Sequence, residues 1–558
     1  MYEPCECMIC KNNKNFDMPE EIIESVLKNN LVLFCGAGIS TESKSVFPES
    51  FYTSILREIE DKTNKKVDLD TSFSRLMSLY IDTFPNGRRK LLNKIKEKFD
   101  FIDSFPQLLN AATSFHREVA ANPFIETIIT TNWDTYFEDY CDCTPVINDT
   151  DVTLWNVFKK RVFKIHGSIN NVGSIVATEK DYEESYSRLS SELIGDRLKT
   201  ILASSTVVFI GFSFGDEDLN RLLDILSEKM GDFSNQFYLV TIDEKWKVNV
   251  DSRVIPIITD GTYFIHQLNN ILIAEGRLVS SDIYDYAEEL LYFIKKEHIK
   301  LFESNTYRNE IKDFPELLLS IAYQDAFIHA LERCVAHRSN GEYLIPGYFQ
   351  PKIQSYESYY KKRISEENYD QAFYNLGYCD GLISLLLFAN NPEEAKIPPL
   401  FIYEENYFET KDDLFKYISE NRNKKHFEYC LGKVKNMNDL VPLVLSFVYF
   451  LFKHVKSLFV IVHIYLYNFD LILLRTPSSI FWKQVGQTLA CAKISLYSSV
   501  ALSISISDSL MRLLFLNISL FNKSLSLLMS SMTPLIFVSF NKVSRIASDL
   551  LRPLNLSK

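Results

Sequence analysis

The stretch that decides the fold is LVLFCGAGIST, residues 31–41. Its first four residues, 31–34, are apolar, as expected of a strand that is buried on both faces of a sheet. Gly36 and Gly38 follow, and small hydroxyl residues beginning at Ser40 stand where a helix would start. Such glycines either form only a tight turn or bring backbone N–H groups close to a phosphate at a helix N-terminus. The rest of the chain has to decide between these two interpretations.

Apolar runs rich in Val, Ile, Phe and Thr recur along the first half of the chain. The candidate strands are LVLF (31–34), FIETIITT (124–131), VFKIHG (162–167), STVVFIGF (205–212), FYLVTID (237–243) and the shorter VIPIIT (254–259). Helical spacing of apolar residues lies between them, for example in 50–60 and 219–230. Strands that alternate with helices predict βαβ units. We therefore expect an α/β fold with a Rossmann-like parallel sheet over residues 18–275.

The pattern changes in the second half of the chain. Residues 280–435 carry apolar residues at three- and four-residue spacing, most clearly in 283–302 and 367–388. This spacing predicts a mainly helical C-terminal region with little strand.

Residues 436–558 form a basic tail rich in Leu and Ser. The tail holds eleven Lys or Arg, four Asp and no Glu, so it carries +7 while the rest of the chain carries −19. A basic segment on an acidic protein suggests a separate partner, such as nucleic acid. Its longest apolar run, 441–467, is interrupted by Lys453 and Lys456, which leaves neither piece long enough to span a membrane. Three interpretations stay open: a buried core, membrane contact, and a segment whose reading frame has been altered.

The cysteines and the N-terminus indicate a cytoplasmic protein. The N-terminal residues lack the pattern of a secretory signal, and ten cysteines in a long cytosolic chain are expected to be free thiols. Cys5, Cys7 and Cys10 are close enough to bind one metal, but a closed zinc site needs a fourth ligand, such as Cys141 or Cys143. We expect no zinc and favour a frayed terminus.

Three further turns place polar side chains directly after predicted strands. They are TTNWD (130–134) with Asn132 and Asp134, KIHGS (164–168) with His166, and GFS (211–213) with Gly211 and Ser213. The carboxyl ends of parallel strands lie at one edge of a sheet, where open α/β sheets place their sites. Each turn also has a structural explanation, because Asn, Asp and Ser cap helices and a histidine at a strand end is often part of the core.

Taken in order, these motifs resemble those of the sirtuin family: GAGIS (36–40), TTNWD (130–134), KIHGS (164–168) and GFS (211–213). The resemblance covers about residues 18–275, or half of the chain. It implies that NAD lies across the edge of the sheet. Of the two interpretations of the glycine turn, it therefore favours phosphate binding.

By position, the resemblance implies a role for each residue. The pyrophosphate would be lined by Gly36, Ala37, Gly38 and Ser40. The nicotinamide ribose would be held by Asn132 and Asp134, and His166 would be the general base. The phosphates and the adenine-side ribose would be contacted by Gly211 and Ser213. An asparagine can position water or ribose hydroxyls, and an imidazole, whose unperturbed pKa is about 6.5, can take up the released proton.

Two departures separate this chain from protein-deacylating sirtuins. Residues 168–210 contain no cysteine, whereas deacylases carry a four-cysteine zinc module there. Residues 42–50 read ESKSVFPES and lack the GIPDFR-type sequence. Both departures favour the sirtuin-like domains of bacterial anti-phage systems, which hydrolyse NAD⁺ to nicotinamide and ADP-ribose. Those proteins join the domain to a sensor or partner-binding region, so the resemblance implies this role for the helical residues 280–435.

The resemblance therefore implies a hydrolase that depletes NAD⁺ during infection. A phage-derived or nucleic-acid-linked activator would act through the C-terminal half, and the chain would work as a homo-oligomer or in a partner complex. Two alternatives stay open: an NAD-dependent protein deacylase or ADP-ribosyltransferase, and a non-catalytic sensor that binds NAD or ADP-ribose. The presence of both Asn132 and His166 argues against the sensor, because binding alone requires neither a base nor a positioned nucleophile.

Overall fold

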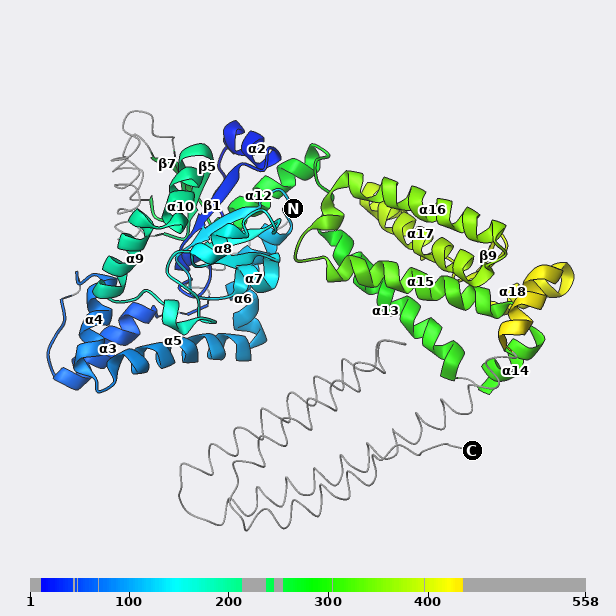
Figure 1. The fold of residues 1–558 in the computed structure, drawn as a ribbon, viewed down its shortest axis with the longest axis horizontal. Coiled ribbons are helices and arrows are strands. Elements are labelled where there is room, and N and C mark those ends of the chain that lie inside the picture. The colour runs from blue at the N-terminus through cyan, green and yellow to red at the C-terminus, as the bar shows by residue number, and fades with distance from the viewer. Residues whose placement is uncertain are drawn as a thin grey trace, which may run out of the picture. The chain divides into compact units, whose positions relative to one another are not determined.

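The computed structural model of the chain describes residues 12–434, except 44–45, 48, 69, 213–236, 245–253, 304 and 396 (Figure 1). The chain divides into two units, residues 1–438 and residues 439–558. The expectations for the tail 436–558 and for the helix at 219–230 therefore fall outside the described residues.

Within the described residues, seven strands form one sheet in the order β3-β4-β2-β1-β5-β6-β7. Every neighbouring pair in this sheet is parallel, which confirms the predicted Rossmann-like sheet. The strands are β1 (Leu31–Cys35), β2 (Thr127–Thr130), β3 (Thr144–Val146), β4 (Arg161–Lys164), β5 (Thr206–Ile210), β6 (Phe237–Thr241) and β7 (Val254–Ile258). The sequence analysis missed β3, because a three-residue edge strand that contains Pro145 is too short to show a period.

The central strand β1 is apolar throughout because both faces of the sheet are covered. All five of its residues are buried. Leu31 and Leu33 pack into the core on one face, whereas Val32 and Phe34 pack into the core on the other. The ring of Phe34 stacks on that of Phe209 in β5, with centroids 5.0 Å apart. Two-sided burial removes the alternation of polar and apolar residues that a half-exposed strand would show.

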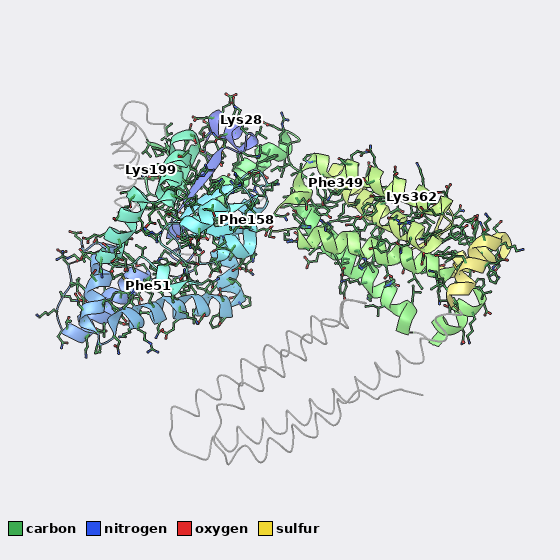
Figure 2. The ribbon with its side chains drawn as sticks, viewed as in Figure 1. Lys28, Phe51, Phe158, Lys199, Phe349 and Lys362 are labelled. Carbon is green, nitrogen blue, oxygen red and sulfur yellow. The ribbon has the colours of Figure 1, made fainter. Side chains whose placement is uncertain are left out.

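Helices cover the two faces of the sheet and form a small module beside it. Residues of α2 (Glu20–Leu27), α6 (Pro106–Ala120), α7 (Tyr136–Cys141) and α12 (Gly261–Ala274) share a core with one face. Residues of α9 (Glu179–Ser191) and α10 (Leu193–Ser204), with Trp155 after α8 (Asp149–Thr153), share a core with the other. The module consists of α3 (Phe51–Thr63), α4 (Phe73–Thr83) and α5 (Gly87–Ser104). It has its own core, in which Phe51, labelled in Figure 2, is buried.

The C-terminal region is mainly helical, as predicted. Its helices are α13 (Asp282–Glu303), α14 (Asn305–Asp313), α15 (Leu317–Ala336), α16 (Phe349–Ser365), α17 (Tyr369–Asn390) and α18 (Lys411–Asn421). The sequence analysis missed a short antiparallel hairpin of β8 (Phe401–Tyr403) and β9 (Asn406–Phe408). Among the described helices, α17 alone is long and apolar enough to cross a membrane, and half of its most apolar stretch is buried. The expected domain boundaries, 18–275 and 280–435, stay predictions.

A fully buried histidine, His116 of α6, packs against α7. Its ring makes edge contacts with Phe137, 4.5 Å away between centroids, and with Tyr136, 5.6 Å away. Burial, followed by the nearby charge of Lys164, lowers the pKa of His116 to about 3. The folded protein therefore keeps His116 neutral at pH values where the unfolded chain would protonate it.

We predict that His116 makes the fold sensitive to acid. Because its folded pKa lies below its unfolded value, the stability that it contributes is present above pH ~6.5 and is lost as the pH falls toward about 3. The loss amounts to about 1.4 kcal/mol per pH unit in this window. Between pH 7 and pH 5, the thermal unfolding midpoint of His116→Phe should fall less than that of the wild type. His266→Phe, on a half-exposed residue of α12, is the control. Equal pH dependence in His116→Phe and the wild type would contradict this prediction.

Candidate functional site

The register of the sheet brings the predicted turns to one edge. Cys35, the last residue of β1, pairs with Thr130 of β2 on one side and with Ile210 of β5 on the other. Thr130 pairs in turn with Lys164 of β4. The turns that begin at residues 36, 131, 165 and 211 therefore leave the sheet at the same level. Asn132 and His166 each lie two residues beyond a paired position.

The glycines bring two of these turns into contact. The N–H of Gly36 donates to the carbonyl of Ile210 at 2.8 Å, and the N–H of Gly38 donates to that of Gly211 at 3.1 Å. A Cβ on Gly38 would lie 2.7 Å from the Gly211 carbonyl oxygen. Gly211 has a φ of +82°, and a Cβ there would lie 2.7 Å from Ile39. Both glycine N–H groups are thus used within the protein, so the immediate role of these glycines is the close approach of the turns. Their predicted contacts with NAD phosphates stay a prediction.

A buried chain of hydrogen bonds links three predicted site residues. The Oγ of Ser40 donates to Oδ2 of Asp134 at 3.1 Å, and Nδ2 of Asn132 donates to the same Oγ at 3.3 Å. The three side chains belong to residues with at most 4% of their surface exposed. Burial raises the pKa of Asp134, while the charge of Lys164 and hydrogen bonds from the backbone of Tyr136 and from Ser40 act in the opposite direction.

This chain fixes the orientation of the Asn132 carboxamide. An ionised Asp134 can only accept, so the Ser40 hydroxyl gives its hydrogen to Asp134 and keeps its lone pairs for a donor. The donor is the NH₂ group of Asn132, which leaves Oδ1 as the free end of the carboxamide. This Oδ1 is buried and has no hydrogen-bond partner among the residues that the structure describes. Buried polar atoms are normally paired, so Oδ1 is suited to accept a hydrogen bond from a ligand hydroxyl or a water.

His166 follows β4 and is almost completely buried, with 4% of its surface exposed. Its ring centroid lies 4.9 Å from that of Tyr182 in α9. Its carbonyl accepts a hydrogen bond from the N–H of Val176 at 3.1 Å. The next residue, Gly167, has a φ of +80°, which turns the chain away from the sheet immediately after the histidine. The structure thus places His166 at the same edge as Asn132, and its role as a base stays a prediction.

The remaining predicted residues are only partly described. Ala37 begins the short 3-10 helix of residues Ala37–Ile39 that follows β1. Ser213 lies outside the described residues, as do Cys5, Cys7 and Cys10 of the zinc alternative. Cys141 and Cys143 are buried free thiols. Among the residues that the structure describes, no three His, Cys, Asp or Glu side chains gather in a way that could hold a metal ion.

The sequence analysis missed Lys164 and Glu138, which lie directly behind the site. The Lys164 side chain is fully buried, forms an ion pair with Glu138 of α7 at 3.0 Å and donates to the backbone carbonyl of Asp134. Burial raises the pKa of Glu138, and the charge of Lys164 opposes this rise. A signal was present in the sequence, because a lysine inside the apolar strand VFKIHG is unusual.

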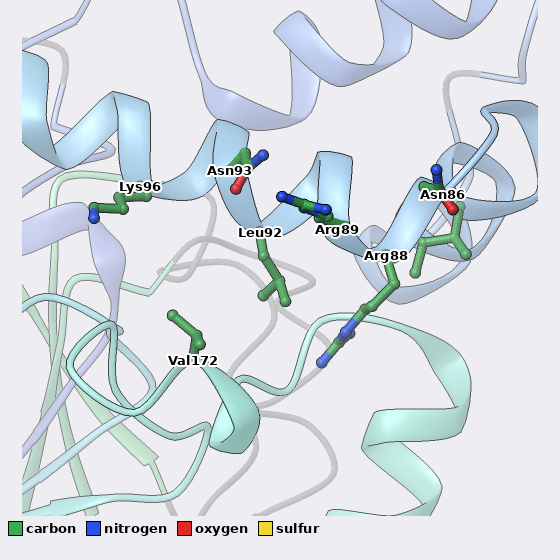
Figure 3. Close-up of a pocket in the computed structure, with 9 residues that line it drawn as sticks. Asn86, Arg88, Arg89, Leu92, Asn93, Lys96 and Val172 are labelled. Carbon is green, nitrogen blue, oxygen red and sulfur yellow. The ribbon is translucent and has the colours of Figure 1, made fainter. Parts of the chain in front are cut away.

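A cavity of about 660 Å³ lies between α5 and the loop that follows His166, which contributes Val172 (Figure 3). It is lined by Ile81, Asn86, Gly87, Arg88, Arg89, Leu92, Asn93, Lys96 and Val172. None of the predicted site residues lines it. The guanidinium of Arg88 donates to the carbonyl of Ile175 at 2.7 Å and forms an ion pair with Asp181. These contacts join α5 to the segment whose Val176 is bonded to His166.

A parallel sheet with polar turns at one edge is the arrangement of nucleotide-binding α/β domains. Residues 126–254 match the family model of the SIR2-like domain. The chain therefore contains a SIR2-like domain, and the predicted resemblance to the sirtuin family is confirmed.

Curated proteins are similar to parts of this chain. The chain is 28% identical to NAD(+) hydrolase ThsA of Enterococcus faecium over 295 aligned residues. This alignment covers 50% of this chain and 57% of that protein. It is 28% identical to NAD(+) hydrolase ThsA of Cytobacillus dafuensis over 227 aligned residues, and this alignment covers 39% of this chain and 42% of that protein. It is 23% identical to Defense-associated sirtuin 2 of Bacillus subtilis over 480 aligned residues, and this alignment covers 78% of this chain and 44% of that protein. The chain thus spans between 42% and 57% of the length of these relatives.

We predict that Gly211→Ala destabilises the protein far more than Gly276→Ala. Both glycines have a positive φ, so both variants suffer the left-handed penalty of about 1–2 kcal/mol. A Cβ at Gly276 meets nothing within 4 Å, whereas one at Gly211 collides with Ile39 and Gly36. We expect a loss of about 3 kcal/mol or more for Gly211→Ala, measured as the shift of the thermal unfolding midpoint against the wild type. Equal shifts in the two variants would contradict the close approach of the turns.

Proposed function

We propose that this protein hydrolyses NAD⁺ to nicotinamide and ADP-ribose and acts in anti-phage defence by depleting NAD⁺. The observation that carries the proposal is the buried Oδ1 of Asn132, which has no hydrogen-bond partner among the described residues, at the strand edge that also holds His166. The names of the relatives support the same reaction, because several are NAD(+) hydrolases and another is a defence-associated sirtuin.

The residues suit the chemistry of this reaction. When the bond between nicotinamide and the ribose breaks, its electron pair leaves with nicotinamide and positive charge develops on the ribose. Oδ1 of Asn132 would accept a hydrogen bond from the attacking water or from a ribose hydroxyl and hold it in line. His166 would accept the proton that the water loses as its oxygen bonds to the ribose carbon. Asp134 would act through Ser40 by keeping Asn132 in the required orientation.

The binding of NAD⁺ would use the turns around these residues. In this proposal Gly36, Ala37, Gly38 and Ser40 lie along the pyrophosphate, and Gly211 and Ser213 approach the adenine-side ribose. Residues 18–275 form the catalytic domain. Residues 280–435 form a sensor or partner-binding region, which restrains the catalytic domain until an activator binds. The basic tail 436–558 would contribute to the binding of this activator. Activation by assembly into a homo-oligomer or a partner complex would suit a hydrolase that must stay silent.

A protein deacylase or ADP-ribosyltransferase is less well supported. The segment 168–210, which would hold the zinc module of a deacylase, contains no cysteine. In the structure this segment forms η2 (Val172–Ser174), α9, α10 and the whole of β5, and residues of α9 and α10 pack on one face of the sheet. The relatives named as hydrolases favour water as the acceptor.

The first test is nicotinamide release from NAD⁺ by the full-length protein, together with cellular NAD⁺ levels during phage infection. We expect Asn132→Ala and His166→Ala each to abolish both nicotinamide release and NAD⁺ depletion, because each removes a group at the reacting centre. His266→Ala, on the surface of α12, is the control and should behave as wild type. Persistence of protection in the His166 variant would favour the non-catalytic sensor.

A second prediction concerns the orientation of Asn132. In Ser40→Ala the carboxamide loses the group that selects its NH₂ end, so kcat should fall by about tenfold to a hundredfold, and KM should rise because Ser40 also lies along the pyrophosphate. Ser25→Ala on α2 is the matched control, because Ser25 is also buried but lies outside the site. Steady-state kinetics of nicotinamide release measures both constants. An unchanged kcat in Ser40→Ala would show that the hydrogen-bond chain does not orient Asn132.

A further inference from the structure

Lys164 places a positive charge in the interior of the protein, in contact with the backbone of Asp134 in the candidate site. Its side chain has no exposed surface, while that of its ion-pair partner, Glu138, is 16% exposed. The lysine therefore joins three segments. It belongs to β4, it is bonded to the carbonyl of Asp134 in the turn after β2, and it is paired with α7.

Stability alone does not account for a charge at this position. Removing two charges from water costs several kcal/mol per ion, and replacement of a buried pair by apolar residues is often neutral or stabilising. An apolar side chain such as Met would fill a similar volume. Met, however, can neither donate a hydrogen bond to the Asp134 carbonyl nor place a positive charge near the Asp134 carboxylate.

The lysine acts on the same residue whose side chain orients Asn132. On its backbone side, Asp134 is held by Lys164. On its side-chain side, it accepts hydrogen bonds from Ser40 at 3.1 Å and from the N–H of Tyr136 at 3.3 Å. A shift of the Asp134 backbone would therefore move the whole chain of hydrogen bonds that ends at Oδ1 of Asn132.

We propose that Lys164 is a positioning residue, which fixes the turn of residues 132–136 and so keeps the carboxamide oxygen of Asn132 directed to the substrate. Its catalytic consequence rests on the proposed function. Its structural consequence, the rigidity of the turn, does not.

The proposal also predicts a pH dependence. The titratable groups that interact with Asp134, Lys164 or Glu138 include Cys35 of β1, Asp103 of α5, His116 of α6, Tyr136 and Glu138 of α7, Cys143, and Lys164 of β4. Of these, Lys164 is the group whose charge favours an ionised Asp134. Without it, burial would raise the pKa of Asp134 further. A protonated Asp134 can donate to Ser40, which frees the Ser40 hydroxyl to donate to Oδ1 of Asn132 and turns the carboxamide the wrong way.

The kinetic test compares Lys164→Met with Lys160→Met in the full-length protein. Lys160 is a second buried lysine, four residues earlier, whose Nζ contacts the carbonyl of Asn122 at 3.5 Å. We expect Lys164→Met to lower kcat at least about tenfold with little change in KM, and to move the acidic limb of the kcat/KM profile upward by about one pH unit. Lys160→Met should leave the position of this limb unchanged.

A double variant shows whether the effect passes through Asp134. In a Ser40→Ala background the link from Asp134 to Asn132 is already broken, so Lys164→Met should no longer move the acidic limb. A shift of the same size in both backgrounds would overturn the proposal. So would a Lys164→Met profile that matches that of the wild type.

Hydrogen exchange tests the structural consequence without any need for activity. The N–H groups of Asn132, Tyr136 and Ile169 are hydrogen-bonded to the turn or within it. They should exchange faster in Lys164→Met than in Lys160→Met. Lys164→Met/Glu138→Leu removes both charges, so it should recover thermal stability but keep the fast exchange and the low kcat. Wild-type exchange rates in a folded Lys164 variant would overturn the proposal.

The two readouts separate this inference from the proposed function. If the wild-type protein fails to release nicotinamide in vitro and fails to deplete NAD⁺ in infected cells, the proposed function is wrong. The exchange rates of the turn then still decide whether Lys164 fixes it.

Discussion

Thr130 is the residue through which three strands of the sheet are held in register at the site. Its hydroxyl donates to the carbonyl of Cys35 at 2.9 Å, and its own carbonyl accepts from the N–H of Ile165 at 3.1 Å. Its hydroxyl also accepts from the N–H of Asn132 at 3.0 Å. A slip of one residue in any of these strands would exchange the two faces of that strand. The turns of the site would then leave the sheet at different levels.

In this register, two kinds of feature form the site: glycines, which lack a side chain and let two turns approach, and buried polar side chains, which contact one another. Gly36, Gly38 and Gly211 allow two turns to approach within backbone hydrogen-bond distance. Ser40 and Asp134 then meet across the edge. Low polarity around them raises the cost of any unmade hydrogen bond, so their network has one favourable arrangement. Within this network, Oδ1 of Asn132 is the acceptor for which the described residues supply no partner, and its place at the strand edge suits it to bind a ligand hydroxyl or a water.

Much of this could be predicted from the sequence, for identifiable physical reasons. Two-sided burial makes β1 and β5 short, mostly apolar runs, which differ from the helical spacing of apolar residues in the amphipathic helices around them. The strand β3 and the hairpin of β8 and β9 escaped notice, because three residues carry no period. The polar turns were recognisable because glycine, asparagine and histidine follow apolar strands. Lys164 was visible in the sequence, but its partners, Glu138 and the Asp134 carbonyl, could be found only after α7 was placed against β4.

The sequence by itself determined the α/β sheet, its helical continuation and the residues that stand at the strand ends, because local periodicity and turn chemistry act over a few residues. The tertiary structure decided which atoms of those residues are available. The N–H groups of Gly36 and Gly38 join two turns, whereas Oδ1 of Asn132 has no hydrogen-bond partner within the part of the chain that the structure describes. Hydrogen-bond direction depends on neighbours that are brought together from residues 40, 132 and 134 only by folding, and no local pattern contains that information.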